Sequence, residues 1–192
     1  MNRSTLSIVS LILAGTFLIL GFHLFNKYGF TPGDQVDAPE RFPASLDSRF
    51  LDKQVPTLFV FAHPKCTCTE ATLAELTRLK KEVGDKMRVK VFISYDPQDA
   101  FEGQQIEKQA RTIANVEVEK DLHRKIAGTF NALTSGQTVL YAPEGNLLFQ
   151  GGITLSRGQE GRSPGAEQIS RIVTGPFIKT EFHRTPTFGC HL

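Results

Sequence analysis

Two cysteines separated by one residue are the part of this sequence best suited to chemistry. Cys66 and Cys68 follow the apolar run Thr57–Ala62 and precede a stretch with helical spacing that begins near Thr69. We therefore expect a buried strand to end at the pair and a helix to begin there. A helix N-terminus carries partial positive charge and unpaired N–H groups, which favour a thiolate. Two thiols at this place predict electron exchange or the binding of a soft metal ion.

The residues around the pair suggest different roles for the two thiols. Cys66 lies nearest the predicted helix start, and positive charge from Lys65 and from protonated His63 would lower its pKa further. A disulfide between Cys66 and Cys68 would close a small, strained ring that is easily reduced. The alternative, that both cysteines only fill the core, poorly explains why they flank the polar Thr67. The redox hypothesis requires that packing does not enclose these thiols.

A third cysteine, Cys190, lies in the segment 188–192, Phe-Gly-Cys-His-Leu. If Phe188 docks on the domain, it brings Cys190 back to the first two thiols. The result would be a three-thiol relay, or a partner for one of the pair. The alternative is a free or intermolecular thiol on a loose tail, because terminal segments are usually mobile unless they are held.

The same atoms also form a candidate metal site, although the redox hypothesis itself needs no cofactor. Thiolate and imidazole ligands select Cu(I) or Zn(II). The candidate ligands are His63, Cys66, Cys68, Cys190 and His191.

Composition excludes several classes of function. The 192 residues suit one domain, and a net charge of +2 gives no electrostatic reason to expect a nucleic-acid partner. Three cysteines are too few, and odd in number, for a disulfide scaffold. Gly151-Gly152 ends a predicted hairpin and is not a dinucleotide motif, because the order of strand, glycine turn and helix differs. Arg157 or Arg162, in the loop that follows, could still reach the cysteines.

Residues 1–30 form a segment of their own. The stretch from Leu6 to Phe25 has no charged residue, and about 20 such residues span a hydrocarbon core as a helix. We interpret it as an uncleaved anchor, because a signal peptide usually has a shorter apolar run of about 7–15 residues and a small-x-small cleavage site. If the amino terminus stays inside the cell, either interpretation predicts that the rest of the chain is extracytoplasmic, on the periplasmic side of a single-pass protein, where thiol chemistry is favoured.

The remaining chain divides into a linker and lead-in at 31–54, a globular domain at 55–175 and a tail at 176–192 that carries Cys190. Within the domain, hydrophobic spacing predicts strands at 57–62, 87–94, 116–118, 137–142 and 147–150 and helices at 70–83, 101–114, 121–127 and 166–173, with Asp121 as a helix cap. Alternating strands and helices require parallel pairing, and the late hairpin adds antiparallel strands. The prediction is an α/β fold, a mixed sheet flanked by helices.

This order, with cysteines after the first strand and a hairpin before the last helix, resembles the thioredoxin superfamily over about residues 50–175. The segments His63-Pro64-x-Cys66-x-Cys68, Thr134-Ser135-Gly136-Gln137, Gly151-Gly152-Ile153-Thr154 and Phe188-Gly189-Cys190 further resemble a bacterial, membrane-tethered thioredoxin-like group, some of whose members are labelled RedB. The resemblance implies a thioredoxin-like fold and disulfide exchange with protein thiols or a small thiol. The chain departs from the family in having Cys-x-Cys instead of Cys-x-x-Cys. The family's cis-proline would fall near Gly136, and its loss favours access of a metal to the thiols.

Three hypotheses follow. In the first, a membrane-anchored thiol–disulfide protein uses Cys66 as the attacking thiolate and Cys68 or Cys190 as the resolving thiol. His63 and Lys65 would tune the pKa of Cys66, and Gly136 would shape the substrate cleft. The second hypothesis is a copper-handling or sensor protein without turnover. The third is a thioredoxin-fold interaction module with vestigial chemistry.

Overall fold

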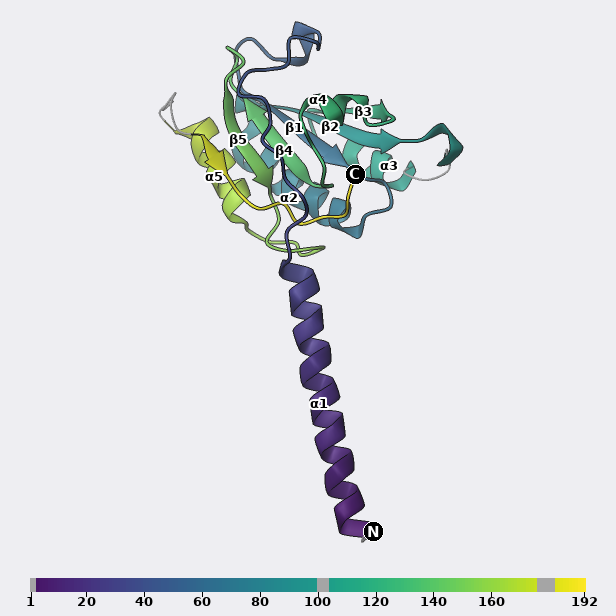
Figure 1. The fold of residues 1–192 in the computed structure, drawn as a ribbon. Coiled ribbons are helices and arrows are strands. Elements are labelled where there is room, and N and C mark those ends of the chain that lie inside the picture. The colour runs from purple at the N-terminus through teal and green to yellow at the C-terminus, as the bar shows by residue number, and fades with distance from the viewer. Residues whose placement is uncertain (1–2, 100–103, 176–181) are drawn as a thin grey trace. The chain divides into compact units, whose positions relative to one another are not determined.

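The computed structural model describes residues 3–99, 104–175 and 182–192 (Figure 1). The chain forms two compact units, one ending at Thr31 and the other running from Pro32 to Leu192, and each is described by itself. Of the predicted helix at 101–114, residues 101–103 lie outside the described residues, and so do residues 176–181 of the predicted tail.

The first unit is a single helix, α1, from Arg3 to Phe30. Its stretch Ser7–Phe30 has a mean hydropathy of 2.3 over its most apolar window, none of which is buried. This helix is long and apolar enough to cross a membrane, and a signal sequence near an N-terminus would have the same properties. The predicted apolar helix is thereby confirmed.

The second unit is built on a six-stranded sheet in the order β3-β2-β1-β4-β5-β6. Its strands are β1 (Thr57–Ala62), β2 (Arg88–Tyr95), β3 (Val116–Leu122), β4 (Gln137–Tyr141), β5 (Leu147–Gly152) and β6 (His183–Arg184). The pairs β1–β2, β2–β3 and β5–β6 are parallel, whereas β4 pairs antiparallel with both β1 and β5. The predicted mixed sheet is confirmed.

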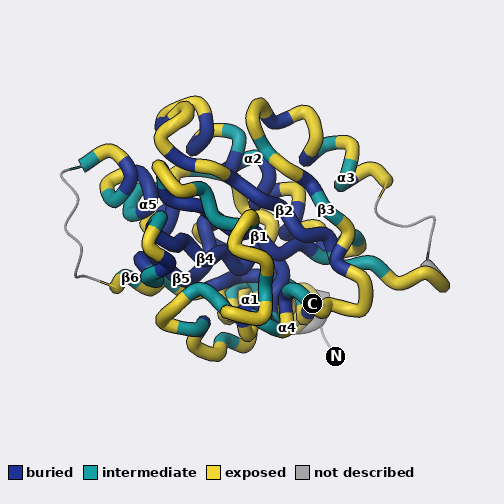
Figure 2. The backbone as a smooth tube through the Cα atoms, turned by 90° about the horizontal axis from the view of Figure 1, so that it is seen from above, coloured by how far each residue is buried: buried dark blue, intermediate teal, exposed yellow. Residues whose placement is uncertain are grey.

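Helices cover this sheet on both sides (Figure 2). They are α2 (Thr67–Val83), α3 (Gln104–Arg111), α4 (Lys125–Thr129) and α5 (Pro164–Thr174), and 3₁₀ turns occur at Ser48–Phe50, Gly84–Lys86 and Pro97–Asp99. Because side chains alternate along a strand, Leu58 and Val60 of β1 join an aliphatic core with α2, α3 and α5. Phe59 and Phe61 join an aromatic core on the opposite face with α4. The central strand is thus buried on both faces.

Several elements differ in extent from the sequence prediction. The third strand extends to Leu122 instead of ending at 118, because its whole length pairs with β2. The prediction stopped at Val118 because three charged residues, Glu119, Lys120 and Asp121, follow it, as they can in an edge strand. Asp121 does accept backbone N–H groups, those of Ile126 and Ala127, but Arg124 occupies the N-cap position of α4.

The lead-in at 31–54 packs within the second unit from Pro32 onward. The ring of Phe42 lies 5.8 Å from that of Phe59, 5.9 Å from that of Phe130 and 5.7 Å from that of Tyr141. Proline and glycine remove any helical or strand periodicity from this segment. It covers the aromatic core through individual side chains, for which sequence periodicity gives no signal.

Candidate functional site

The site begins at the junction between β1 and α2. After β1 ends at Ala62, the backbone N–H of Cys66 bonds the His63 carbonyl at 3.2 Å, which closes a turn. Cys66 is then the N-cap residue of α2, with extended backbone angles, and its carbonyl accepts the N–H of Thr69 at 2.9 Å. The predicted placement of a thiol where a buried strand meets a helix N-terminus is confirmed.

Three thiols meet at this junction. The sulfur atoms of Cys66, Cys68 and Cys190 all lie within 4.8 Å of one another. Those of Cys66 and Cys190 are 2.7 Å apart, and the backbone N–H of Cys190 points at the Cys66 sulfur from 3.4 Å. Of the two arrangements considered for the tail, the structure has the docked one, with the Cys190 thiol in contact with Cys66.

The three thiols differ strongly in acidity. The pKa of Cys66 is lowered from 9.0 to about 4, mainly by a hydrogen bond from the Cys68 thiol and further by the thiol and backbone N–H of Cys190, against the effect of burial. The pKa of Cys68 is raised, first by its hydrogen bond to Cys66 and then by burial. Burial and the bond to Cys66 raise the pKa of Cys190 to about 11. Near neutral pH the cluster therefore holds one thiolate, on Cys66, and two thiol donors.

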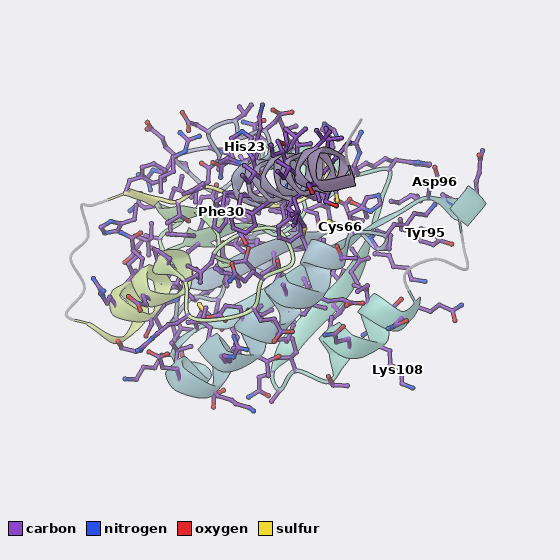
Figure 3. The ribbon with its side chains drawn as sticks, turned by 90° about the horizontal axis from the view of Figure 1, so that it is seen from below. His23, Phe30, Cys66, Tyr95, Asp96 and Lys108 are labelled. Atoms are coloured by element: carbon purple, nitrogen blue, oxygen red, sulfur yellow. The ribbon has the colours of Figure 1, made fainter. Side chains whose placement is uncertain are left out.

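Packing encloses the first two thiols, whereas the redox hypothesis requires them to be open to a partner. Cys66 is 2 % exposed and Cys68 is 3 % exposed (Cys66 is labelled in Figure 3). The docked tail accounts for part of this burial, since Cys190 lies directly against Cys66, and two other residues of the tail, Phe188 and Leu192, are themselves buried. The residues around the pair carry no signal for this cover, because it arises from a segment more than a hundred residues away.

Two residues not singled out by the sequence analysis hold the site together. The Ser135 hydroxyl accepts the backbone N–H of His63 at 2.9 Å and lies 2.9 Å from the Thr69 hydroxyl. Thr69 in turn donates to the His63 carbonyl at 2.8 Å. These bonds join the loop before β4 to the first turn of α2. The motif Thr134-Ser135-Gly136 was the available signal, but it did not assign a role to its serine.

Gly136 lies at the bend that carries this loop into β4. Its N–H donates to the Phe61 carbonyl at 2.8 Å, and its φ of +87° is one that favours glycine. A β-carbon here would also meet the Thr72 hydroxyl at 2.8 Å. The residue thus allows the loop to lie against both β1 and α2. The described residues contain no cis peptide bond.

The two candidate histidines lie outside the sulfur cluster. The ring Nδ1 of His63 accepts the backbone N–H of Lys65 at 3.1 Å, and both residues line a cavity of about 360 Å³ that Tyr95 and His123 also border. The ring Nδ1 of His191 lies 2.8 Å from the Leu192 carbonyl oxygen. Among the described residues, the only group of three or more potential metal ligands is the set of three cysteines.

The loop after β5 also reaches the site. Arg157 donates to the carbonyl of Gly189, beside Cys190, and its charge partly offsets the rise in the pKa of that thiol. Arg162 instead pairs with Glu167 at 3.3 Å. Of the two arginines considered from the sequence, Arg157 is therefore the one at the thiols.

Comparisons with known proteins give a likeness of fold. No protein-family model and no curated protein matches the chain. A hypothetical protein of Sinorhizobium meliloti is 18% identical over 84% of this chain and 93% of that one, with a TM-score of 0.59. An uncharacterized conserved protein of Geobacillus kaustophilus is 17% identical over 84% of this chain and 91% of that one, with a TM-score of 0.57. A secreted disulfide oxidoreductase of Mycobacterium tuberculosis is 14% identical over 69% of this chain and 92% of that one, with a TM-score of 0.44.

Proposed function

Starting from the thioredoxin-like fold of this chain, we propose that it exchanges thiols and disulfides with a thiol-bearing partner protein through Cys66 and Cys190. The observation that carries the proposal is the contact between these residues, with 2.7 Å between their sulfurs and the pKa of Cys66 lowered to about 4. A thiolate is the nucleophile of disulfide exchange, and it needs a second thiol within reach to release the partner. The narrower likeness to the RedB-labelled group stays a prediction.

The reaction proceeds in two balanced steps. The Cys66 thiolate attacks one sulfur of a partner disulfide, so that a mixed disulfide forms and one partner thiolate leaves. The Cys190 thiol then gives up its proton and attacks the Cys66 sulfur, which forms the Cys66–Cys190 disulfide and releases the second partner thiolate. Two electrons pass from the chain to the partner; the proton from Cys190 goes to one partner thiolate, and the other thiolate takes its proton from solvent. In the reverse direction the chain oxidises a partner dithiol.

Cys68 supports the reaction as a hydrogen-bond donor. Its raised pKa keeps it protonated, and its thiol contributes most to the low pKa of Cys66. A ring closed between Cys66 and Cys68 would be strained, which disfavours Cys68 as the resolving thiol. Gly136 would shape the substrate cleft, because it lets the loop before β4 lie against α2. His63 and Lys65 border a cavity in which a small thiol is a second candidate partner.

The helix α1 would anchor this activity to a membrane. Its apolar stretch Ser7–Phe30 supports a single span. With the amino terminus inside the cell, the thiol domain would then work on the periplasmic side, where disulfides persist.

The test is thiol mapping by mass spectrometry on full-length protein alkylated directly in cells. We expect an oxidised fraction in which Cys66 is joined to Cys190 while Cys68 is alkylated. Cys66→Ser should abolish exchange with a disulfide substrate, whereas Cys68→Ala should slow it without abolishing it. A disulfide between Cys66 and Cys68, or three thiols that never oxidise, would contradict the proposal.

A copper-handling role is the second candidate, and the mutual approach of three sulfurs within 4.8 Å favours it. Soft thiolates select Cu(I), and these three cysteines would hold it. Zinc suits the set less well, because structural zinc takes four ligands and both histidines lie outside the cluster. Metal analysis of the protein purified under reducing conditions tests this role. Stoichiometric copper lost equally in Cys68→Ser and Cys190→Ser would support it, and copper-free protein would refute it.

A further inference from the structure

An exchange reaction with an outside partner faces an obstacle, because Cys66 is almost completely buried. With 2 % of its surface exposed, its sulfur is out of reach of a second protein. The atom that occupies the place of an attacking or attacked sulfur is the Sγ of Cys190, at 2.7 Å. Access to Cys66 therefore depends on the segment that carries Cys190.

The segment 188–192 is held by backbone pairing around one isolated bridge. The Ser135 N–H donates to the Cys190 carbonyl at 2.8 Å, and the Leu192 N–H donates to the Leu133 carbonyl at 2.8 Å. Between these bonds, Thr134 and His191 form an antiparallel bridge. Backbone pairing of this kind does not depend on the identity of the side chains, so another extended segment can form the same bonds.

The side chains of the segment supply the remaining fit. Gly189 lies so close to the loop that a β-carbon would stand 1.9 Å from the Ser135 carbonyl oxygen. On either side of Gly189 and Cys190, Phe188 and Leu192 are buried. The pattern is an extended chain with an apolar residue, a glycine and a cysteine in succession, and a second apolar residue two positions after the cysteine.

The tail is attached to the body of the unit mainly by exchangeable bonds. Gly33 donates its N–H to the Thr187 carbonyl at 2.8 Å, and the Gln35 amide donates to the Thr187 hydroxyl at 2.7 Å and to the Thr185 carbonyl at 3.1 Å. No covalent link fixes the segment while its cysteine is reduced, since Cys190 is a free thiol. It can therefore leave and return.

We propose that residues 188–192 are an internal substrate segment: they occupy the binding site for an extended, cysteine-containing segment of the partner, which pairs with 133–135 in their place. This inference rests on the proposed thiol–disulfide exchange. The partner's cysteine takes the position of Cys190 and reacts with Cys66, with the tail displaced. When the partner's segment unpairs from 133–135, still joined to Cys66 by the mixed disulfide, the returning tail brings Cys190 to that disulfide and resolves it, as balanced above. Partner binding and Cys190 docking are mutually exclusive.

The test uses full-length protein in detergent and a capped peptide, Phe-Gly-Cys-His-Leu, whose cysteine is joined by a disulfide to thionitrobenzoate. Attack by Cys66 on the peptide sulfur releases the coloured thionitrobenzoate anion, so the rate is read directly. Gly189→Ala and Gln35→Ala should loosen the tail and raise the second-order rate constant by about tenfold or more, because the open site is then more populated. Gly128→Ala, where a β-carbon meets nothing within 4 Å, is the matched control and should not change it.

A second peptide, with alanine in place of its glycine, tests the shape of the site. It should react about tenfold more slowly than the glycine peptide if it must fit under the Ser135 carbonyl, because only a small fraction of bound complexes would then be competent. Equal rates for the two peptides would mean that the tail is only a cover, and wild-type rates in both loosened variants would mean that it does not limit access. If Gly189→Ala fails to fold by circular dichroism, Gln35→Ala decides the question of access.

Exchange with bis(hydroxyethyl) disulfide distinguishes a failure of this inference from a failure of the proposed thiol–disulfide exchange on which it rests. If no variant reacts with this small disulfide at Cys66, the exchange function itself fails. If the variants react with it while the peptide results are negative, only the internal substrate segment fails.

Discussion

Replacing Cys68 with alanine tests the electrostatics of the site most directly. The Cys68 thiol is the largest cause of the low pKa of Cys66, and Cys66 is 2 % exposed, so bulk water does not simply replace the lost donor. A hydrogen bond to a charged acceptor contributes about 1.5–3 kcal/mol, and about 1.4 kcal/mol corresponds to one pKa unit. The pKa of Cys66 should therefore rise from about 4 to roughly 5–6 in the variant.

The assay is the ultraviolet absorbance of the thiolate, recorded against pH on the reduced full chain in detergent. Because the pKa values of Cys68 and Cys190 are raised, Cys66 alone ionises in the acidic range. At about pH 5 the fraction of Cys66 present as thiolate should fall from about nine-tenths to between about a tenth and a half in Cys68→Ala. Alkylation of Cys66 at that pH, followed by mass spectrometry, should slow in proportion.

Cys68→Ser is the matched control, since its hydroxyl keeps a donor of similar size at the same position. Its midpoint should lie between those of the wild type and Cys68→Ala. A midpoint that stays near 4 in Cys68→Ala would refute the argument that one thiol holds the charge of the other. A wild-type midpoint near 9.0 would refute it more broadly.

Three further predictions concern resolution, pH and the loop before β4. Cys190→Ser should leave the mixed disulfide with a partner peptide unresolved, and mass spectrometry should find it accumulating on Cys66; rapid release of the peptide would contradict this. The pKa of Cys66 is lower in the folded state, so below pH 9 the unfolded state binds more protons. The free energy of unfolding of the reduced chain, measured by urea titration, should therefore fall by about 1 kcal/mol per pH unit from pH 7 to 5. Cys66→Ser should remove this slope. Gly136→Ala should cost about 1–3 kcal/mol in the same titration, because of its positive φ and the Thr72 hydroxyl, whereas Gly128→Ala should change stability by less than about 1 kcal/mol; equal losses would count against the steric argument.

The parts of this fold that could be predicted are those specified by local sequence. The unbroken apolar run of β1 and the three- and four-residue spacing of leucines in α2 each identify an element without reference to the rest of the chain. The start of α2 was placed three residues late, because the helix begins directly after its N-cap, Cys66. Local pattern could not show the full length of β3, which depends on the pairing partner β2.

The candidate site also has one part that local sequence predicts and one part that depends on distant contacts. The position of Cys66 at a helix start follows from its neighbours in sequence, and the structure has it there. The contact of Cys190 with Cys66 was one of two open alternatives, because it depends on backbone bonds between 188–192 and 133–135 that no local signal encodes. The enclosure of Cys66 was not foreseen for the same reason. Long-range backbone pairing, not residue type, decides whether a thiol is reachable.

The two margins of the described sheet restrict where a foreign strand can attach. At one margin, β3 turns Glu117 and Lys120 to the solvent, and charged side chains on an outer strand discourage pairing with another chain. At the other, β6 is only two residues long and offers almost no ladder to extend. An extended chain that meets this domain therefore finds little at either margin of the described sheet to pair with, which limits aggregation through the sheet edges.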